Sequence, residues 1–220
     1  FTVLVKLETT MALALFIKSL SYLSKLTLVT FTLAMLTLAN AKADTVLIYG
    51  DSLSASYGMP QAQGWVILLQ KMLPQHQIIN ASVSGETTAG GLQRLPALLN
   101  DIKPDLIFIE LGGNDGLRGF PIKQLTQNVT SMVQLAQASG TKVLLSEVMV
   151  PPNYGPRYAK QFNQVFQKIS DKESVILVPF FMTQIATNSS LMQADGIHPN
   201  TDAQAHIQRF MQPWIVNNLN

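Results

Sequence analysis

Four short segments of the sequence carry side chains that could perform covalent chemistry. They are GDSL with Ser52, NASVSGET with Gly85, ELGGND with Asn114, and DGIHPN with Asp195 and His198. A serine hydroxyl is a weak nucleophile at neutral pH unless a base takes its proton during the attack, and an imidazole suits that task. Together the segments supply a nucleophile, a base, a carboxylate and hydrogen-bond donors, which is the set that acyl transfer requires.

Each of these residues has an expected role in that reaction. We predict Ser52 as the nucleophile and His198 as the base, with Asp195 fixing the tautomer of the imidazole from three residues earlier. Negative charge grows on the carbonyl oxygen during attack, so N–H donors must already be in place to meet it. The backbone N–H groups of Ser52 and Gly85 and the side-chain amide of Asn114 are the predicted oxyanion hole.

The elements that must position these residues follow from the hydrophobic pattern. Helical spacing is expected in five segments, and short apolar runs alternate with them. The predicted strands are Thr45–Tyr49, Gln77–Asn80, Leu106–Glu110, Lys142–Ser146 and Ser174–Val178. The predicted helices are Trp65–Leu73, Leu92–Leu99, a segment between Pro121 and Gly140, Tyr158–Ile169, and about Asp202–Asn217, the last with a capping box of Thr201 and Gln204.

Strands that alternate with helices of this length predict an α/β fold. We expect a single doubly wound (flavodoxin-like) sheet of about five parallel strands with helices on both faces, because parallel neighbours need a crossover connection. In such a sheet the loops at the carboxyl ends of the strands open onto one edge. The chemistry-bearing segments are therefore expected to meet there.

Other polar side chains near these segments have simpler interpretations. Asp51 and Asp115 are typical of turn and capping carboxylates, because the base already has an aspartate partner. Ser54 and Ser84 do not directly follow a predicted junction of strand and turn. We expect no metal or cofactor, since His206 lies eight residues from the predicted base and cysteine is absent.

The beginning of the chain has the pattern of a targeting segment. Lys18 and Lys25 precede the uncharged apolar run Leu26–Leu38, and AKA follows with small residues suited to cleavage. We predict that residues 1–43 include a secretory signal peptide cleaved after Ala43, which gives a periplasmic or secreted protein. The alternative to a cleaved signal peptide is an uncleaved membrane anchor, which would need roughly 20 apolar residues to span a bilayer.

The predicted mature domain, residues 44–220, is nearly neutral. Removal of residues 1–43 takes four lysines and one glutamate, which leaves eleven basic and twelve acidic side chains. This near-neutral net charge does not indicate a nucleic acid or an anionic surface as partner. We expect a monomer without a stable membrane anchor that acts on a small acyl ester or lipid.

The four segments resemble the sequence blocks of the SGNH (GDSL) hydrolase family. The likeness covers nearly the whole predicted mature chain. It is closest to the periplasmic thioesterase I/protease I/lysophospholipase L1 (arylesterase) subgroup, through GGNDGLRG at 112–119, RLPALL at 94–99, NYG at 153–155 and PFFM at 179–182. The resemblance implies a serine esterase that hydrolyses aryl or acyl esters, lysophospholipids or acyl thioesters through an acyl-enzyme on Ser52, with the site residues in the roles given above.

Two positions depart from the pattern of that family. Ser56 stands where many relatives have glycine, and we expect it to narrow the approach to the site. Met149 stands where close relatives often carry arginine, which argues against a bound anionic group such as coenzyme A.

Three other functions share some of these sequence features. A lipase-type α/β-hydrolase would need glycine at position 54 of its G-x-S-x-G elbow, where this chain has Ser54. A carbohydrate-acetyl esterase on the same scaffold and a non-catalytic periplasmic binding module are the two alternatives left open. A binding module has no physical need for the complete set of serine, histidine, aspartate and asparagine.

Overall fold

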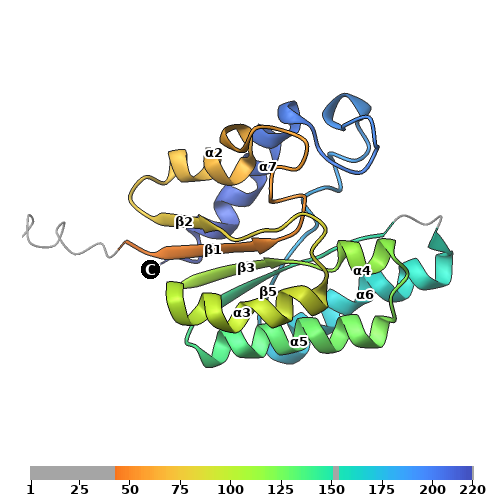
Figure 1. Ribbon diagram of the computed structural model, residues 1–220, viewed down its shortest axis with the longest axis horizontal. Helices are drawn as coiled ribbons and strands as arrows, with labels where there is room; N and C mark the ends of the chain where they lie inside the picture. The colour runs from red at the N-terminus through yellow and green to blue at the C-terminus, as the bar shows by residue number, and fades with distance from the viewer. Residues whose placement is uncertain (1–42, 151–153, 220) are drawn as a thin grey trace, which may run out of the picture. The chain divides into compact units, whose positions relative to one another are not determined.

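The apolar runs form a five-stranded parallel sheet in the order β2-β1-β3-β4-β5 (Figure 1). The computed structural model describes residues 43–150 and 154–219. Its strands are β1 (Thr45–Gly50), β2 (Gln77–Asn80), β3 (Leu106–Glu110), β4 (Lys142–Ser146) and β5 (Ile176–Val178). The predicted doubly wound α/β fold is confirmed. The predicted signal peptide lies outside the described residues.

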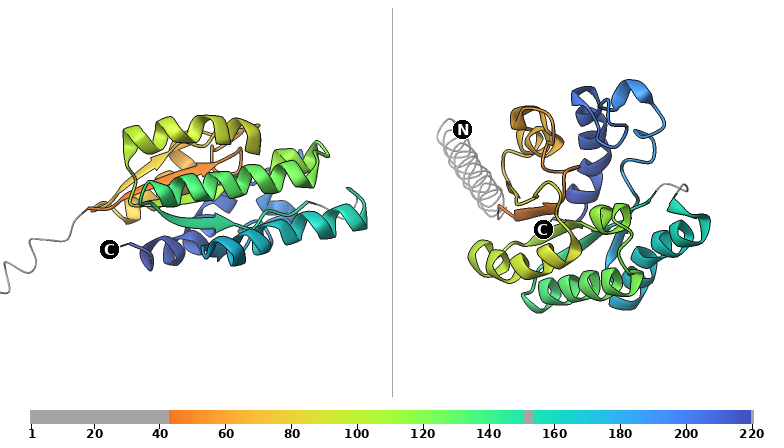
Figure 2. Two further views of the ribbon diagram at one scale, coloured as in Figure 1. Left: turned by 90° about the horizontal axis from the view of Figure 1, so that it is seen from below. Right: turned by 45° about the vertical axis from the view of Figure 1, so that its right-hand side comes forward.

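Helices cover both faces of the sheet (Figures 1 and 2). One face packs against α3 (Thr88–Ile102), α5 (Ile122–Ala138) and α6 (Pro156–Glu173), and the other packs against α2 (Trp65–Met72) and α7 (Thr201–Val216). The remaining elements are the five-residue α4 (Gly113–Leu117) and the short 3₁₀ helices η1 (Gln61–Gln63) and η3 (Ser189–Leu191). No helix in the described part of the chain is long and apolar enough to cross a membrane.

Strand β1 lies inside the sheet and is buried on both of its faces. Leu47 and Tyr49 enter the core beneath α3, α5 and α6, whereas Val46 and Ile48 enter the core beneath α2 and α7. This alternation explains the uninterrupted apolar run, since a strand covered on both faces needs no polar residues. The same burial holds the turn after Gly50 in a fixed place.

Helix α7 is capped differently from the prediction. Its N-cap is Asn200, whose side-chain oxygen accepts hydrogen bonds from the backbone N–H groups of Asp202 and Ala203. The predicted capping box was therefore wrong, because Thr201 is already helical. The amide oxygen of Gln204 accepts instead from the backbone N–H of Trp65 at 3.0 Å, which links α7 to the start of α2.

Helix α3 and strand β5 also begin at residues other than the predicted ones. Helix α3 begins at Thr88 rather than Leu92, because the side chain of Thr87 accepts from the N–H of Gly90 and caps the helix earlier. Strand β5 begins at Ile176 rather than Ser174, since Ser174 ends α6 in the left-handed conformation with φ +54°.

Candidate active site

Ser52 lies in the turn after β1, at the carboxyl edge of the sheet. The turn forms because the N–H groups of Ser54 and Ala55 donate to the carbonyl of Asp51, at 3.3 and 3.0 Å. Strands β1 and β3 are neighbours in the sheet. From β1 the chain continues to β2 on one side, and from β3 it continues to β4 on the other side. Such a switch point creates the crevice in which doubly wound folds bind their ligands.

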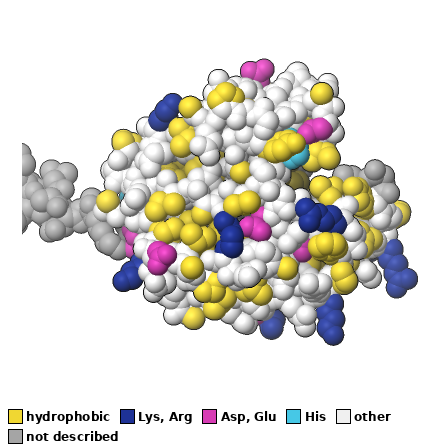
Figure 3. All heavy atoms as spheres, in the orientation of Figure 1, with side chains coloured by type: hydrophobic (Ala, Val, Ile, Leu, Met, Phe, Trp, Pro, Cys, Tyr) yellow, Lys and Arg dark blue, Asp and Glu magenta, His cyan; other side chains and the backbone are white. Residues whose placement is uncertain are grey.

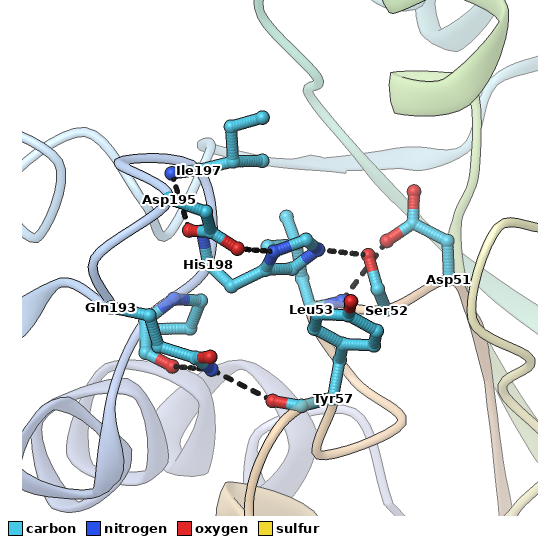
Figure 4. Close-up of polar contacts among 9 residues, drawn as sticks. Asp51, Ser52, Leu53, Tyr57, Gln193, Asp195, Ile197 and His198 are labelled. Atoms are coloured by element: carbon cyan, nitrogen blue, oxygen red, sulfur yellow. Dashed lines mark hydrogen bonds and ion pairs between the residues drawn. The ribbon is translucent and has the colours of Figure 1, made fainter.

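Ser52, His198 and Asp195 form one hydrogen-bonded row (Figure 4). The hydroxyl of Ser52 lies 2.9 Å from Nε2 of His198, and Nδ1 of His198 lies 2.7 Å from Oδ2 of Asp195. With a proton on Nδ1, Nε2 is left free to accept the serine proton. The sequence predicted all three members of this row, and the fold brings them together across 146 positions of the chain.

The second oxygen of Asp195 holds the loop that carries the imidazole. Oδ1 accepts from the N–H groups of Ile197 and His198 at 2.9 and 3.0 Å. The hydrogen bond from the His198 ring, followed by these backbone bonds, lowers the pKa of Asp195 to about 2. Asp195 therefore stays ionised at every pH at which a neutral imidazole could act as a base.

A second contact joins the serine turn to the histidine loop (Figure 4). The amide nitrogen of Gln193 donates to the carbonyl of Tyr57 at 2.7 Å and to the carbonyl of Pro199 at 3.0 Å. The ring of Tyr57 lies 4.3 Å from the ring of His198, centroid to centroid. These contacts fix the two loops relative to each other independently of the catalytic hydrogen bond.

Asn114 reaches the same crevice from the loop after β3. It is the second residue of α4, and Gly112 precedes this helix with φ +126°, a conformation that L side chains rarely adopt. One N–H of its amide donates to Oδ2 of Asp51 at 3.1 Å. Asn114 lines the cavity at Ser52, and its role as an oxyanion donor stays a prediction.

Gly85 lies in the loop after β2, which runs beside the end of β1. The N–H of Val83 donates to the carbonyl of Gly50 at 3.1 Å, and the carbonyl of Gly85 accepts from Arg118 at 3.2 Å. Gly85 has φ +77° and is not among the described residues that line the cavity at Ser52. Its role as an oxyanion donor stays a prediction.

A buried pair of acidic side chains lies behind the nucleophile. Asp51 is 2% exposed and Glu110, the last residue of β3, is 0% exposed. Glu110 was missed by the sequence analysis, although a charged residue that ends the apolar run LIFIE was a signal. Oδ1 of Asp51 accepts from the N–H of Leu53 at 3.1 Å, as expected of a turn carboxylate.

The side chains of the remaining polar candidates make contacts away from the hydroxyl of Ser52. Asp115 accepts from the backbone N–H of Thr88 at 2.8 Å, so it is a capping carboxylate, and the helix that it contacts is α3. The hydroxyl of Ser54 donates to Glu110 at 2.9 Å. The expectation that Ser56 narrows the site was wrong, because its hydroxyl packs against Gly64 and Ser56 does not line the cavity.

The row of three opens into a mostly apolar cavity of about 220 Å³. On the face drawn in Figure 3, hydrophobic side chains gather beside a histidine at the upper right. Met149, which is 41% exposed, is one of the lining residues. The cavity walls carry aliphatic, thioether and aromatic side chains from helix α4 and four loops, namely Leu53, Leu117, Val148, Met149, Phe180, Met182, Ala186, Met192 and Ile197.

Among the described residues, no group of three or more histidine, cysteine or acidic side chains is arranged to hold a metal ion. The arrangement at Ser52 instead combines a hydroxyl, an imidazole and an ionised carboxylate in hydrogen-bond contact. A doubly wound sheet with this row at its carboxyl edge defines the class of the α/β serine hydrolases.

The chain belongs to the GDSL-like Lipase/Acylhydrolase family, whose model matches residues 48–206. It is 50% identical over 179 residues to "Esterase TesA" of Pseudomonas aeruginosa. The aligned residues cover 80% of this chain and 89% of that protein. It is 44% identical over 188 residues to "Thioesterase 1/protease 1/lysophospholipase L1" of Escherichia coli K12, which covers 85% of this chain and 88% of the relative. The resemblance noted from the four segments is confirmed.

The fold is likewise similar to that of a solved esterase. The psychrotrophic esterase EstA from Pseudoalteromonas sp., in a structure inhibited by monoethylphosphonate, matches with a TM-score of 0.77 and 48% identity. The match covers 79% of this chain and 97% of that one.

Proposed function

We propose that this protein, a serine esterase, hydrolyses carboxylic esters through an acyl-enzyme on Ser52. The observation that carries the proposal is the row from Ser52 through His198 to Asp195 at the mouth of an apolar cavity. The relatives named as esterases support it, and so does the inhibition of EstA by a phosphonate, a class of reagent that can form a covalent bond to a serine.

The geometry suits a reaction in two steps. In the first step, Nε2 of His198 takes the proton of Ser52 as Oγ bonds to the ester carbonyl carbon. The resulting oxyanion is met by the amide of Asn114 and by the N–H groups of Ser52 and Gly85. The carbon–oxygen bond to the alcohol then breaks, and His198 returns the proton to the leaving oxygen.

In the second step, water attacks the acyl-enzyme. His198 takes a proton from the water as its oxygen bonds to the acyl carbon, and the oxyanion is met by the same donors. The bond between the acyl carbon and Ser52 Oγ breaks, and the proton moves from His198 to the serine. The carboxylic acid leaves and the free enzyme is restored.

The cavity indicates which substrates fit best. Its lining offers apolar contacts to an acyl chain or an aryl ring, and each buried methylene stabilises binding by ~0.8 kcal/mol. Aryl esters, acyl esters and lysophospholipids suit such a site. A carbohydrate acetate is less suited, because the hydroxyl groups of a sugar would lose water without gaining partners.

The choice of leaving group provides the test of this proposal. At matched acyl length, p-nitrophenyl esters should have higher kcat/KM than coenzyme A thioesters, because Met149 cannot pair with phosphate as an arginine could. Met149→Arg should raise kcat/KM for the thioester relative to that for the aryl ester. A strong preference of the natural enzyme for the thioester would contradict the assignment of substrate class.

Covalent labelling distinguishes the enzyme from the alternative of a non-catalytic binding module. A fluorophosphonate probe should label folded protein at Ser52, located by peptide mass spectrometry. Folded protein that neither takes the label nor turns over any ester would favour the binding module over the enzyme.

We further infer that the enzyme is exported and that its mature form begins at Asp44. The support is the order of Lys25, the apolar run and the small residues that end at Ala43. Intact-mass measurement on protein recovered from the periplasm or the medium should give the mass of residues 44–220. Retention of Lys42 or earlier residues would contradict cleavage at this position.

A further inference from the structure

A chain of buried and partly buried hydrogen bonds runs from the end of the central strands to the amide of Asn114. Oδ2 of Asp51 accepts one amide N–H of Asn114 at 3.1 Å, while Oδ1 accepts the N–H of Leu53 at 3.1 Å. The Asp51 carboxylate therefore contacts both the nucleophile turn and the predicted oxyanion donor. Residues 51 and 114 are 63 positions apart in the chain.

Glu110 fixes the other side of Asp51. Oε2 of Glu110 accepts from the hydroxyl of Ser54 at 2.9 Å and from the N–H of Asp51 at 3.4 Å. Oε1 is buried without a hydrogen-bond partner in the described part of the chain. Gly50 leaves the room for this contact, because a Cβ atom there would lie 2.5 Å from Oε2.

Burial opposes the ionisation of both carboxyls. Burial, reinforced by the charge of Asp51, holds the pKa of Glu110 well above its ordinary value. Burial raises the pKa of Asp51 to about 6, although the Leu53 N–H, the charge of His198 and the Asn114 amide favour its ionised form. Asp115 also faces Asp51 and opposes its ionisation. The hydrogen bonds to Asp51 thus favour a carboxylate there, whereas burial and the charge of Asp51 both oppose ionisation of Glu110.

We propose that Asp51 is a positioning residue of the esterase reaction, whose ionised carboxylate fixes the amide of Asn114 so that its second N–H points to the oxyanion. An amide group is planar, so holding one N–H sets the direction of the other. A charged acceptor makes this bond stronger than a neutral one would. The inference rests on the proposed function, since it assigns Asn114 to the oxyanion hole.

This role has a consequence for the dependence of activity on pH. The carboxylate is present above about pH 6 and is lost as the pH falls through that value. A protonated Asp51 would present a hydroxyl where the Asn114 amide needs an acceptor, so the amide would lose its fixed direction. Activity should then fall in acid through Asp51 in addition to the protonation of the imidazole base.

Removal of the Asp51 carboxylate tests the proposal. At neutral pH, Asp51→Ala should lower kcat for a p-nitrophenyl ester by about 10- to 100-fold with a smaller change in KM. Asp51→Asn should lie between this variant and the natural enzyme, because one amide oxygen must serve both the Leu53 N–H and Asn114. Asp51→Asn also keeps the experiment informative if Asp51→Ala folds poorly.

The ratio of natural to variant kcat separates positioning from a merely structural role. This ratio should be largest above pH 7 and should fall toward pH 5, approaching about one for Asp51→Asn, because protonated Asp51 resembles that variant. The matched control is Thr141→Ala, which removes the buried hydrogen bond from the Thr141 hydroxyl to the carbonyl of Pro104, and its ratio should not vary with pH although its melting temperature falls. An unchanged kcat in Asp51→Ala, or a ratio independent of pH in both Asp51 variants, would overturn the proposal.

Failure of the proposed function would look different. The natural enzyme would then show neither turnover of esters nor fluorophosphonate labelling of Ser52. Labelling and turnover by the natural enzyme, measured first, thus leave the Asp51 variants to report on positioning alone.

Discussion

Ser52→Ala, His198→Ala and the double variant are expected to be about equally inactive, each losing on the order of 10⁶-fold in kcat while remaining folded. The reason is that the hydroxyl and the imidazole take part in one step. Once either is gone, the 2.9 Å hydrogen bond that carries the proton no longer exists, so removal of the second has little further effect. Steady-state kinetics on a p-nitrophenyl ester, with circular dichroism of each variant, measures this.

The matched control for the nucleophile is Ser84→Ala. Ser84 is exposed in the loop after β2 and should leave kcat at the level of the natural enzyme. A double variant far less active than either single variant, with unchanged circular dichroism, would show that Ser52 and His198 act in separate steps and would contradict the proposed mechanism.

Asn114→Ala should lower kcat by about 10² to 10³-fold, or roughly 2.7 to 4 kcal/mol of transition-state stabilisation, with a smaller effect on KM. The amide meets charge that is present only in the transition state, so its loss is felt in kcat rather than in binding. The nucleophile remains, and a fluorophosphonate should therefore still label the variant slowly. Ser52→Ala should not be labelled at all.

A purely structural role for Asn114 predicts a different result. If its amide served only to satisfy Asp51, its removal would lower the melting temperature and leave kcat of the folded fraction nearly unchanged. Measuring both quantities on one preparation separates the two roles. An unchanged kcat would remove Asn114 from the oxyanion hole.

The parts of the molecule that depend on local pattern were predictable from the sequence. The runs that became β1 and β3 are apolar on both faces, which is typical of strands inside a parallel sheet. Asp195 and His198 are close in the chain, so their contact required only a tight loop. Ser52 followed from the junction of an apolar run with turn residues, and its contact with the base followed from the edge at which parallel strands end.

The parts that depend on contacts between distant segments were not predictable. Glu110 looks like the polar end of a strand, and only the fold shows that its carboxyl is fully buried beneath Gly50. The second contact of Asp51 joins loops that are 63 residues apart. Asn200 rather than Thr201 is the N-cap of α7, because the side-chain oxygen of Asn200 accepts hydrogen bonds from two backbone N–H groups.

The position of the histidine loop directly before α7 also determines when this protein becomes active as it folds. The turn with Ser52 belongs to the first strand, whereas the base lies 146 residues later and is held by a helix that must dock against α2. Contacts of such long sequence separation close late, because the entropy of the intervening chain opposes them. A chain that is still emerging from a ribosome or a translocation channel would hold its serine without a base. The esterase would thus gain hydrolytic power only once its C-terminal helix is in place.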